Sequence, residues 1–183
     1  MAKVVGGMTM SLDGFVSGEH GGLDRLYMDL AALLASEVLR EEIRTTGAIV
    51  MGRTSFNMGD PDSFADSYEY QVPIFVLTHH PPAKLPKQNE RLTVTFVSGD
   101  IEPVIAWAKT AAGERNVLLI GVSVNHQCLR AGLCDELHFG IVPALLGSGK
   151  RFFDGYEVSG LRLEKFRSFE EGDRADLWYR LVR

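Results

Sequence analysis

Short apolar runs rich in β-branched residues alternate with segments of helical period along most of this chain of 183 residues. Strands separated by helices are typical of strand–helix–strand units, in which successive strands run parallel. The sequence therefore predicts an α/β fold with a mostly parallel central sheet, and Pro73 places the start of one strand near a sheet edge. The predicted strands cover residues 3–10, 48–51, 72–77, 93–97, 116–120 and 136–142.

The segments between these strands differ in their periodicity. Apolar residues at helical spacing predict the longest helix at residues 23–44. Further helices are predicted at residues 103–111 and 123–130, the second with Ser123 as its N-cap. Residues 57–71 contain acidic residues, a Pro and a Gly without a clear period. This composition indicates a surface excursion and the most mobile part of the chain.

The C-terminal part of the sequence changes character. Residues 161–169 and 175–183 flank a short connection that contains a Gly, which predicts an antiparallel hairpin that closes the sheet. The two-residue period of the last strand puts Trp178 and Val182 on an otherwise polar face, which suggests a partner there. We see no linker or internal repeat, so a single domain is expected over residues 1–183.

Composition excludes several classes of protein. The formal net charge of −5 argues against general affinity for the polyanionic backbone of nucleic acids. The spacing of Cys128 and Cys134 matches neither a redox motif nor a zinc-ligand set, so both are expected to be free thiols. We recognise neither a signal peptide nor an apolar run long enough to span a membrane. A cytoplasmic protein is therefore expected.

The sharpest local motif follows the second predicted strand. A buried run ends at Gly52, and Arg53, Thr54 and Ser55 then stand in what reads as the first turn of a helix. Free backbone N–H groups, the guanidinium and two hydroxyls suit a phosphate. The alternative is structural, with Gly52 permitting the turn and Thr54 capping the helix.

A second junction of this kind joins residues 116–120 to the next helix. Gly121 would let the backbone approach a diphosphate, and Ser123 could donate a hydrogen bond to it. A capped helix after a strand is also commonplace, so this motif alone favours the structural interpretation.

A third strand end carries Leu77, Thr78, His79 and His80. Parallel sheets bind ligands outside the carboxyl ends of their strands, so the hydroxyl and the histidines could contact a phosphate there. They could equally be solvated loop residues. No metal site is expected, because adjacent residues in an extended segment point to opposite faces.

Two carboxylates are candidates for roles at a substrate. Asp13 follows the first strand beside Gly14, where it could orient a substrate or hold the loop through its own hydrogen bonds. Glu136 could contribute in the same way or be an ordinary polar residue at the start of a strand. The segment 147–150 resembles part of a phosphate loop but lacks its required residues, and is predicted to be a turn.

Taken together and in this order, the motifs resemble the dihydrofolate reductase-like family. The likeness is greatest to the C-terminal reductase domain of the bifunctional riboflavin-biosynthesis deaminase/reductase, and it covers almost the whole chain. The segments that carry it are Met10-Ser11-Leu12-Asp13-Gly14-Phe15, Val50-Met51-Gly52-Arg53-Thr54, Val76-Leu77-Thr78, Gly121, residues 131–137, and residues 143–149 with Arg151-Phe152-Phe153.

The resemblance implies a three-layer fold that binds NADPH along the strand ends and passes a hydride to a pyrimidine or pterin-like ring. It also implies a homodimer, which would give Trp178 and Val182 a partner. By the same likeness, the diphosphate would be held by Gly52, Arg53 and Thr54 and covered by Gly121 to Ser123. The 2′-phosphate would lie near Thr78 and His79. The nicotinamide and the substrate would face Asp13 and Glu136.

The sequence departs from the family pattern at three places. Many relatives carry Gly-Gly where this chain has Gly121-Val122, and many carry Arg where it has His79 and His80. The helical segment after Gly22 matches neither the dihydrofolate reductases nor the riboflavin enzymes. These departures leave the substrate and the choice between NADPH and NADH open.

The function predicted from the sequence is an NADPH-dependent reductase of a small heterocycle. A riboflavin-pathway aminopyrimidine of the 5-amino-6-(5-phosphoribosylamino)uracil type is preferred. The alternatives are a pterin reductase of the dihydrofolate reductase type and a non-catalytic, dimeric nucleotide-binding module. The proton that accompanies the hydride could come from Asp13, Glu136 or an ordered water.

Overall fold

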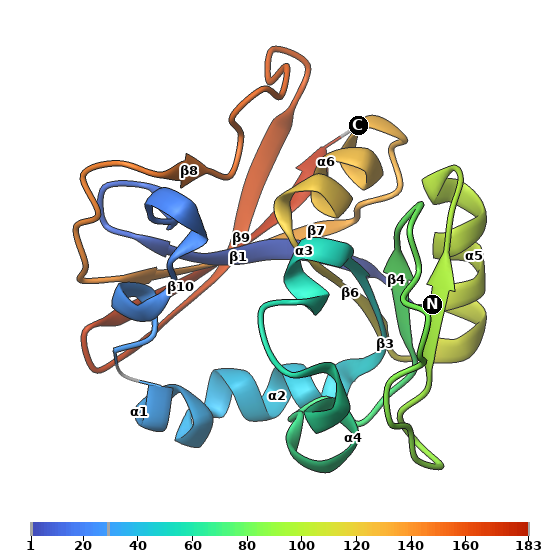
Figure 1. Cartoon of the computed structure of the whole chain (residues 1–183). Coiled ribbons are helices and arrows are strands. Elements are labelled where there is room, and N and C mark those ends of the chain that lie inside the picture. The colour runs from blue at the N-terminus through green and yellow to red at the C-terminus, as the bar shows by residue number, and fades with distance from the viewer. Residues whose placement is uncertain (1, 29, 183) are drawn as a thin grey trace. The chain divides into compact units, whose positions relative to one another are not determined.

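Strand β1, Val4–Ser11, takes part in both of the compact units into which the chain divides. The computed structural model describes residues 2–28 and 30–182 (Figure 1). The first unit comprises Met1–Val5 and Ile43–Cys134, and the second comprises Gly6–Glu42 and Asp135–Arg183. Each unit therefore combines two separate stretches of sequence, and the expectation of a single domain stays a prediction.

In the first unit, every pair of neighbouring strands is parallel. Its helices follow the strands, as expected of strand–helix–strand units. The strands are β3 (Thr46–Gly52), β4 (Ile74–Leu77), β5 (Val94–Val97) and β6 (Asn116–Ile120), with the start of β1. The helices are α3 (Arg53–Phe56), η3 (Pro61–Ser63), α4 (Phe64–Ser67), α5 (Ile101–Ala112) and α6 (Val122–Arg130).

The apolar runs explain this arrangement. Strand β3 is buried from Thr46 to Met51, as a central parallel strand covered on both faces must be. Helix α5 buries Val104, Ile105 and Ala108, which recur at helical spacing. The predicted strands of this unit are confirmed, and so is the helix that contains Pro103 in its first turn.

The second unit is antiparallel at its C-terminal end. Strand β10 (Arg174–Val182) pairs antiparallel with both β7 (Glu136–Val142) and β9 (Arg162–Glu171), which confirms the predicted hairpin. The remaining elements are β2 (Phe15–Ser17) paired with β8 (Lys150–Arg151), η1 (Glu19–Gly21), η2 (Asp24–Leu26), α1 (Leu30–Ala35) and α2 (Glu37–Thr45).

Hydrogen bonds join the strands in the order β5-β4-β3-β6-β1-β7-β10-β9. The predicted fold class, a mostly parallel central sheet with a C-terminal antiparallel hairpin, is confirmed. Among the described residues, no helix has the length and hydrophobicity that crossing a membrane requires. Cys128 and Cys134 are reduced thiols, as predicted, and both are buried. Burial raises the pKa of the Cys128 thiol to about 12.

The predicted helix at residues 23–44 is wrong. The segment contains η2, α1 and α2, and Ser36 separates the two α-helices. The Ser36 hydroxyl accepts a hydrogen bond from the Leu39 amide at 3.1 Å, which is how an N-cap residue starts a new helix. Apolar periodicity continues through this break, so the pattern alone did not reveal it.

Two local predictions also need correction. Strand β4 lies between β3 and β5, so Pro73 does not mark a sheet edge; it precedes the strand, and its carbonyl accepts a hydrogen bond from the Ile49 amide. Ser123 does not cap α6, because the residue at the cap position is Gly121.

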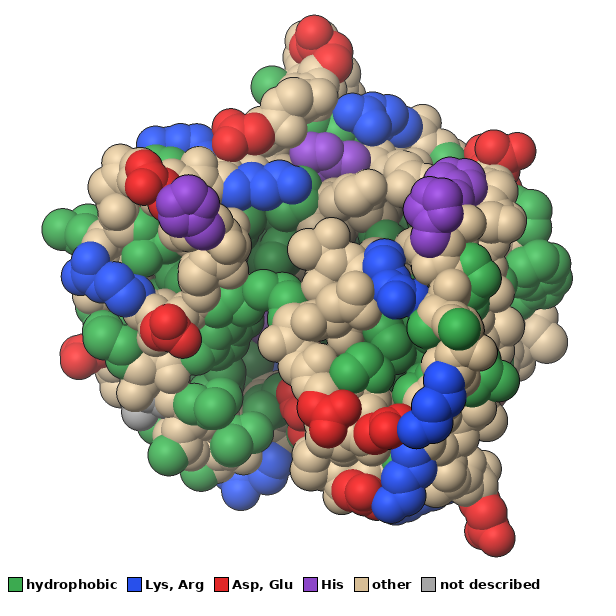
Figure 2. All heavy atoms as spheres, viewed as in Figure 1, with side chains coloured by type: hydrophobic (Ala, Val, Ile, Leu, Met, Phe, Trp, Pro, Cys, Tyr) green, Lys and Arg blue, Asp and Glu red, His purple; other side chains and the backbone are tan. Residues whose placement is uncertain are grey.

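The surface excursion at residues 57–71 is partly folded. Phe64 is buried and stacks on Phe56 with ring centroids 5.2 Å apart. Ion pairs from Lys84 and Lys87 reach the acidic residues of this segment, and Figure 2 shows basic and acidic side chains meeting there. Its predicted mobility stays a prediction.

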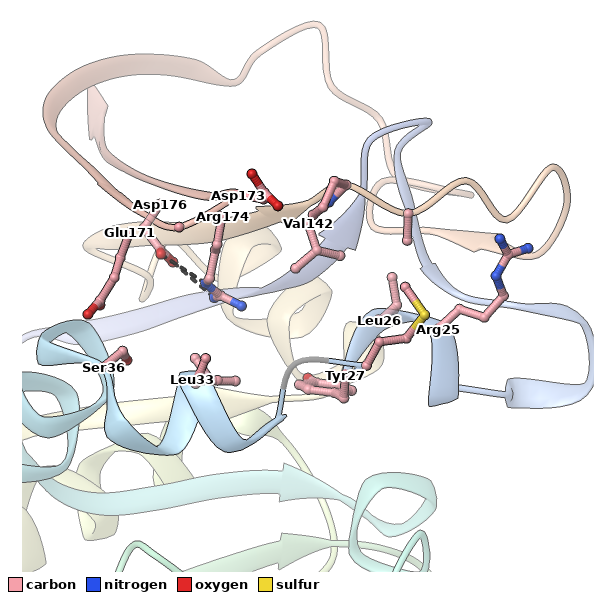
Figure 3. Close-up of a pocket in the computed structure, with 15 residues that line it drawn as sticks. Arg25, Leu26, Tyr27, Leu33, Ser36, Val142, Glu171, Asp173, Arg174 and Asp176 are labelled. Carbon is pink, nitrogen blue, oxygen red and sulfur yellow. Dashed lines mark hydrogen bonds and ion pairs between the residues drawn. The ribbon is translucent and has the colours of Figure 1, made fainter.

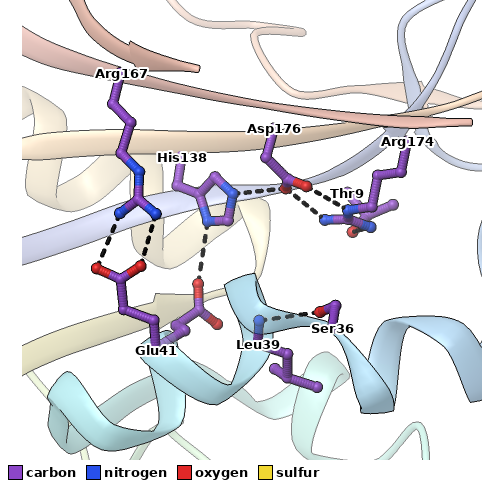
Figure 4. A network of polar contacts seen from close by, with 9 residues as sticks. Thr9, Ser36, Leu39, Glu41, His138, Arg167, Arg174 and Asp176 are labelled. Carbon is purple, nitrogen blue, oxygen red and sulfur yellow. Dashed lines mark hydrogen bonds and ion pairs between the residues drawn. The ribbon is translucent and has the colours of Figure 1, made fainter. Parts of the chain in front are cut away.

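A buried network of charged groups ties together the strands of the second unit (Figure 4). His138 Nε2 lies 2.7 Å from Asp176 Oδ1, and His138 Nδ1 lies 3.1 Å from Glu42 Oε2. Arg174 donates to the same Asp176 carboxylate from Nε and Nη2, both at 2.9 Å. Asp176 is 1% exposed, so its charge depends on these two partners.

Trp178 packs against this network. Its ring stacks on His138 with centroids 4.2 Å apart, and the Arg167 guanidinium lies 4.3 Å from the Trp178 centroid. Arg167 in turn makes two hydrogen bonds to Glu41. Trp178 thus has ring contacts within its own chain and stays partly exposed, and Val182 is 38% exposed. The partner that the sequence suggested for this face stays a prediction.

The two carboxylates determine the charge of His138. Burial lowers the pKa of His138, but hydrogen bonds to Asp176 and Glu42 outweigh burial and raise it. Burial raises the pKa of Asp176, but hydrogen bonds from His138 and Arg174 outweigh it and lower that pKa. A His138 pKa above its ordinary value of 6.5 adds stability that is lost as pH rises through the folded-state pKa. The lowered Asp176 pKa adds stability above its ordinary value of 3.8.

We therefore predict that His138→Gln lowers the free energy of unfolding at about pH 6 by roughly 1.5–3 kcal/mol, the range for hydrogen bonds to charged groups. The loss should shrink at about pH 8, because the wild-type histidine then contributes less. Urea unfolding at both pH values measures it, with the exposed His80→Gln as control. An equal loss at both pH values would contradict the prediction.

Candidate functional site

The strand ends that carry the three predicted phosphate motifs lie next to one another in the first unit. Gly52 of β3 is paired with Leu77 of β4, and Met51 is paired with Ile120 of β6. Because these strands are parallel, their carboxyl ends meet at one edge of the sheet. The structure thus brings together the segments that begin at Gly52, Thr78 and Gly121.

The closest approach in this group joins the first and second motifs. A Cβ atom at Gly121 would lie 2.6 Å from Ser55 Oγ, a separation that real Cβ contacts do not show. Gly121 also has φ of +98°, a conformation that favours glycine. Val122 then begins α6 with its side chain buried, so the departure from Gly-Gly leaves the turn itself intact.

The backbone at these turns is free of side-chain caps. Neither α3 nor α6 has a side-chain hydrogen bond at its cap residue, Gly52 or Gly121. The alternative in which Thr54 caps its helix is therefore not what the structure shows, and Thr54 is exposed. Helix α6 is nine residues long, and its first N–H groups lack partners of the intrahelical type.

Arg53 is the strongest single indication of a ligand. Its Nη1 atom is buried and has no hydrogen-bond partner among residues 2–28 and 30–182. Its Cζ atom lies 5.7 Å from the ring centroid of Phe96, an aromatic contact that leaves the N–H groups unsatisfied. A buried unpaired donor costs about 1–3 kcal/mol, and more when it is charged. An anion that accepts from Arg53 would remove this cost.

The third motif forms a turn of its own. The Thr78 amide donates to the Val97 carbonyl at 2.8 Å, and Thr78 Oγ1 accepts from the His80 amide at 3.1 Å. His79 and His80 are exposed. The part of the chain that the structure describes contains no group of His, Cys, Asp and Glu side chains that could hold a metal ion.

In the second unit, Asp13 anchors a loop. Its carboxylate accepts hydrogen bonds from Ser11 Oγ at 2.6 Å, from the Leu146 amide at 3.1 Å and from the Gly147 amide at 2.7 Å. The Ser11 hydroxyl, followed by the Gly147 amide, lowers the pKa of Asp13 to about 2. The segment 147–150, which resembles a phosphate loop, is thus a turn held by Asp13.

Glu136 lies at the other end of the strands from Asp13. Gly7 of β1 lies against His138 of β7, and the Leu12 amide donates to the Ala144 carbonyl, so the two strands run in the same direction. Asp13 follows the end of β1, whereas Glu136 is the first residue of β7. The structure therefore does not bring the two carboxylates together. Glu136 is buried, and its Oε1 lies 4.0 Å from Arg180 Nε.

A cavity of about 370 Å³ opens in the second unit (Figure 3). Helix α1 and η2 line one side, and the ends of β7 and the β9–β10 hairpin line the other. A volume of this order suits a small ligand. The lining residues are Arg25, Leu26, Tyr27, Met28, Ala32, Leu33, Ser36, Val142, Pro143, Ala144, Glu171, Gly172, Asp173, Arg174 and Asp176.

Sequence reasoning did not single out the polar residues of this cavity. Asp176 and Arg174 stand two residues apart on the last strand and so share a face, which was the available signal. From that face, the sequence indicated only that Trp178 and Val182 would meet a partner. The apolar side chains of Met28, Leu30 and Leu34 remain exposed next to the cavity, where Figure 2 shows hydrophobic side chains over the α1 segment.

Comparison with known families agrees with the geometry. The family model described as the RibD C-terminal domain matches residues 2–174. The chain belongs to this family. The resemblance predicted from the motifs is thus confirmed.

Individual relatives support the same family. The uncharacterized protein YyaP of Bacillus subtilis is 25% identical over 93% of this chain and 90% of its own length. A protein of Shewanella sp. PV-4 assigned to riboflavin biosynthesis is 26% identical, with a TM-score of 0.80 and full coverage of both chains. The deaminase/5-amino-6-(5-phosphoribosylamino)uracil reductase of Thermotoga maritima is 14% identical with a TM-score of 0.76, and this chain covers 57% of it.

We predict that Asp13→Ala frees the turn that its carboxylate holds. The amides of Leu146 and Gly147 should exchange their hydrogens with solvent at least about tenfold faster, because each loses a charged acceptor. Hydrogen exchange followed by NMR measures this. Since the pKa of Asp13 is about 2, wild-type protection should persist to about pH 4. Unchanged exchange at both amides would show that Asp13 does not anchor the turn.

Proposed function

We propose that this chain is an NADPH-dependent reductase that transfers a hydride to a small heterocycle. The preferred substrate is a riboflavin-pathway aminopyrimidine of the 5-amino-6-(5-phosphoribosylamino)uracil type. The observation that carries the proposal is the Nη1 atom of Arg53, which is buried and has no hydrogen-bond partner among the described residues, in a chain of the RibD C-terminal domain family. The Thermotoga relative, which is a reductase of that compound, supports the choice of substrate.

The residues present fit a phosphorylated dinucleotide. Arg53 would donate to the diphosphate from its unpaired Nη1, and Ser55 and the first amides of α6 lie around the same turn. Thr78 and the exposed His79 would lie near the 2′-phosphate. The nicotinamide ring would supply the hydride, and the role of the chain is to bind and orient it. Gly121 keeps the approach to the diphosphate open.

Of the three proton sources that the sequence suggested, we propose the ordered water. The pKa of about 2 leaves Asp13 ionised at neutral pH, so it accepts hydrogen bonds and has no proton to give. Glu136 begins β7, at the other end of the strands from Asp13. The role that fits Asp13 is to fix the turn at Leu146 and Gly147.

We also propose that the chain forms a homodimer, as its family resemblance implies. Trp178 stacks on His138 and Arg167 within the chain and is only partly exposed, so the proposal does not rest on it. Light scattering on the eluted peak of a sizing column gives the mass directly. A mass twice the 20.2 kDa of the chain is expected, and a mass equal to it would exclude the homodimer.

The proposed cofactor site is tested by titration of NADPH into the wild type and the Arg53→Ala variant. Loss of a charge-assisted hydrogen bond should weaken NADPH binding by about 1.5–3 kcal/mol while the protein stays folded. Arg91→Ala, which removes an exposed arginine of the same unit, is the matched control and should bind like the wild type. Equal affinity of all three proteins would remove Arg53 from the site.

Turnover separates the proposal from its alternatives. The oxidation of NADPH is followed by the loss of absorbance of the reduced nicotinamide ring, with an aminopyrimidine or dihydrofolate as the acceptor. Oxidation with the aminopyrimidine alone supports the proposed reductase, and oxidation with dihydrofolate alone supports the pterin reductase. NADPH binding without oxidation in either case would support the non-catalytic module.

A further inference from the structure

Arg174 presents its guanidinium to the cavity of the second unit. Its side chain is 16% exposed, and Figure 3 shows it extending from β10 toward the space above α1 and Leu33. The lining of that space is mostly apolar, with Leu26, Val142 and Ala144 among its residues. A cation on the wall of an apolar cavity is costly unless it has hydrogen-bond partners.

Three surrounding groups fix the position of this guanidinium. Asp176 accepts from Nε and Nη2, and Thr9 Oγ1 accepts from Nη1 at 3.2 Å. Gly140, paired with Asp176 across β7 and β10, leaves the room that the guanidinium occupies. A Cβ atom at position 140 would overlap Arg174 Nη2. The guanidinium is therefore held in one orientation before any ligand arrives.

This orientation leaves donors for a ligand. Each terminal nitrogen of a guanidinium carries two N–H groups. In Arg174 one N–H of Nη1 is directed to Thr9 and one of Nη2 to Asp176, so each nitrogen retains a further N–H. Asp176, by contrast, already accepts from both His138 and Arg174 and is 1% exposed. Arg174 and Asp176 together therefore present hydrogen-bond donors to the cavity rather than acceptors.

The charge of Arg174 is already balanced. The carboxylates of Asp176 and Glu42 face the guanidinium of Arg174 and the imidazole of His138. With a protonated imidazole the four groups sum to zero, and with a neutral one they sum to a negative charge. Arg25, Glu171 and Asp173 also line the cavity, and their charges add no excess of positive charge. A phosphate is therefore disfavoured here, whereas an uncharged carbonyl oxygen needs only the N–H groups.

We propose that Arg174 binds a ring carbonyl of the substrate, so that the cavity selects a planar ring with carbonyl groups over its amino-substituted counterpart. This inference rests on the proposed function and specifies how the substrate is recognised. The apolar side chains of the cavity would cover the faces of the ring. A pterin reductase needs an acceptor for the amino group of its ring. Asp176 is already paired with Arg174, and the other carboxylates that line the cavity, those of Glu171 and Asp173, are exposed to solvent at the β9–β10 turn.

The test uses two probes that differ in the groups at the ring edge. 5,6-Diaminouracil carries ring carbonyls, and 2,4,5,6-tetraaminopyrimidine carries amino groups in their place. Calorimetric titration of the full chain should show at least about tenfold tighter binding of the diaminouracil, a factor of ten being about 1.4 kcal/mol. Tighter binding of the tetraaminopyrimidine, binding of neither probe, or displacement of the diaminouracil by inorganic phosphate would each overturn the proposal.

Two variants assign the selectivity to Arg174. Arg174→Met removes the donors and should abolish the preference for the diaminouracil. Gly140→Ala keeps every charge but displaces the guanidinium, so it should reduce the same preference even if Arg174→Met fails to fold. Arg167→Met removes an arginine that binds Glu41 outside the cavity and should keep the preference. Undiminished preference in a folded Arg174→Met variant, or in Gly140→Ala, would contradict the assignment.

NADPH titration of the same variants distinguishes this inference from the proposed function. Arg174 and Gly140 belong to the second unit, and the residues proposed for the cofactor belong to the first. Normal NADPH binding together with absent probe selectivity would refute the role of Arg174 alone. Absence of NADPH binding in the wild type would refute the proposed function, whatever the probes do.

Discussion

The close approach of Gly121 to Ser55 is the constraint on which the candidate cofactor site depends. Parallel pairing of β3 with β6 brings the two turns together. The φ of +98° at Gly121 favours glycine, and a Cβ atom there would displace the Ser55 hydroxyl. With this contact in place, the Ser55 hydroxyl lies at the turn from which α6 begins. The site thus follows from strand register and one glycine, and α3, with four residues, adds little dipole of its own.

In the second unit, the position of the residues on the cavity wall likewise depends on a single carboxylate, that of Asp176. Asp176 receives His138 from one side and Arg174 from the other, and Gly140 provides the space between the strands. The same contacts stabilise the fold and orient the guanidinium. Since breaking a buried ion pair leaves an uncompensated charge, substitutions here should affect stability and recognition together, which is why the conservative variants matter.

Local sequence patterns were sufficient to predict the strands and to find the motifs at their ends, because a buried run or a glycine turn is encoded within a few residues. They were insufficient where the outcome depends on distant partners. Apolar periodicity runs through Ser36, so the break between α1 and α2 was missed. The position of Glu136 relative to Asp13 depends on strand direction, and the role of Arg174 depends on its cross-strand neighbour Gly140.

The central claim is that the strand ends of the first unit hold a phosphorylated nicotinamide dinucleotide. A crystal structure of the protein grown with NADPH tests it most directly. The account predicts a phosphate oxygen of the diphosphate within hydrogen-bond distance of Arg53 Nη1, with Gly121 and Ser55 beside it. A dinucleotide bound elsewhere, or Arg53 Nη1 still without a partner in the complex, would contradict the account.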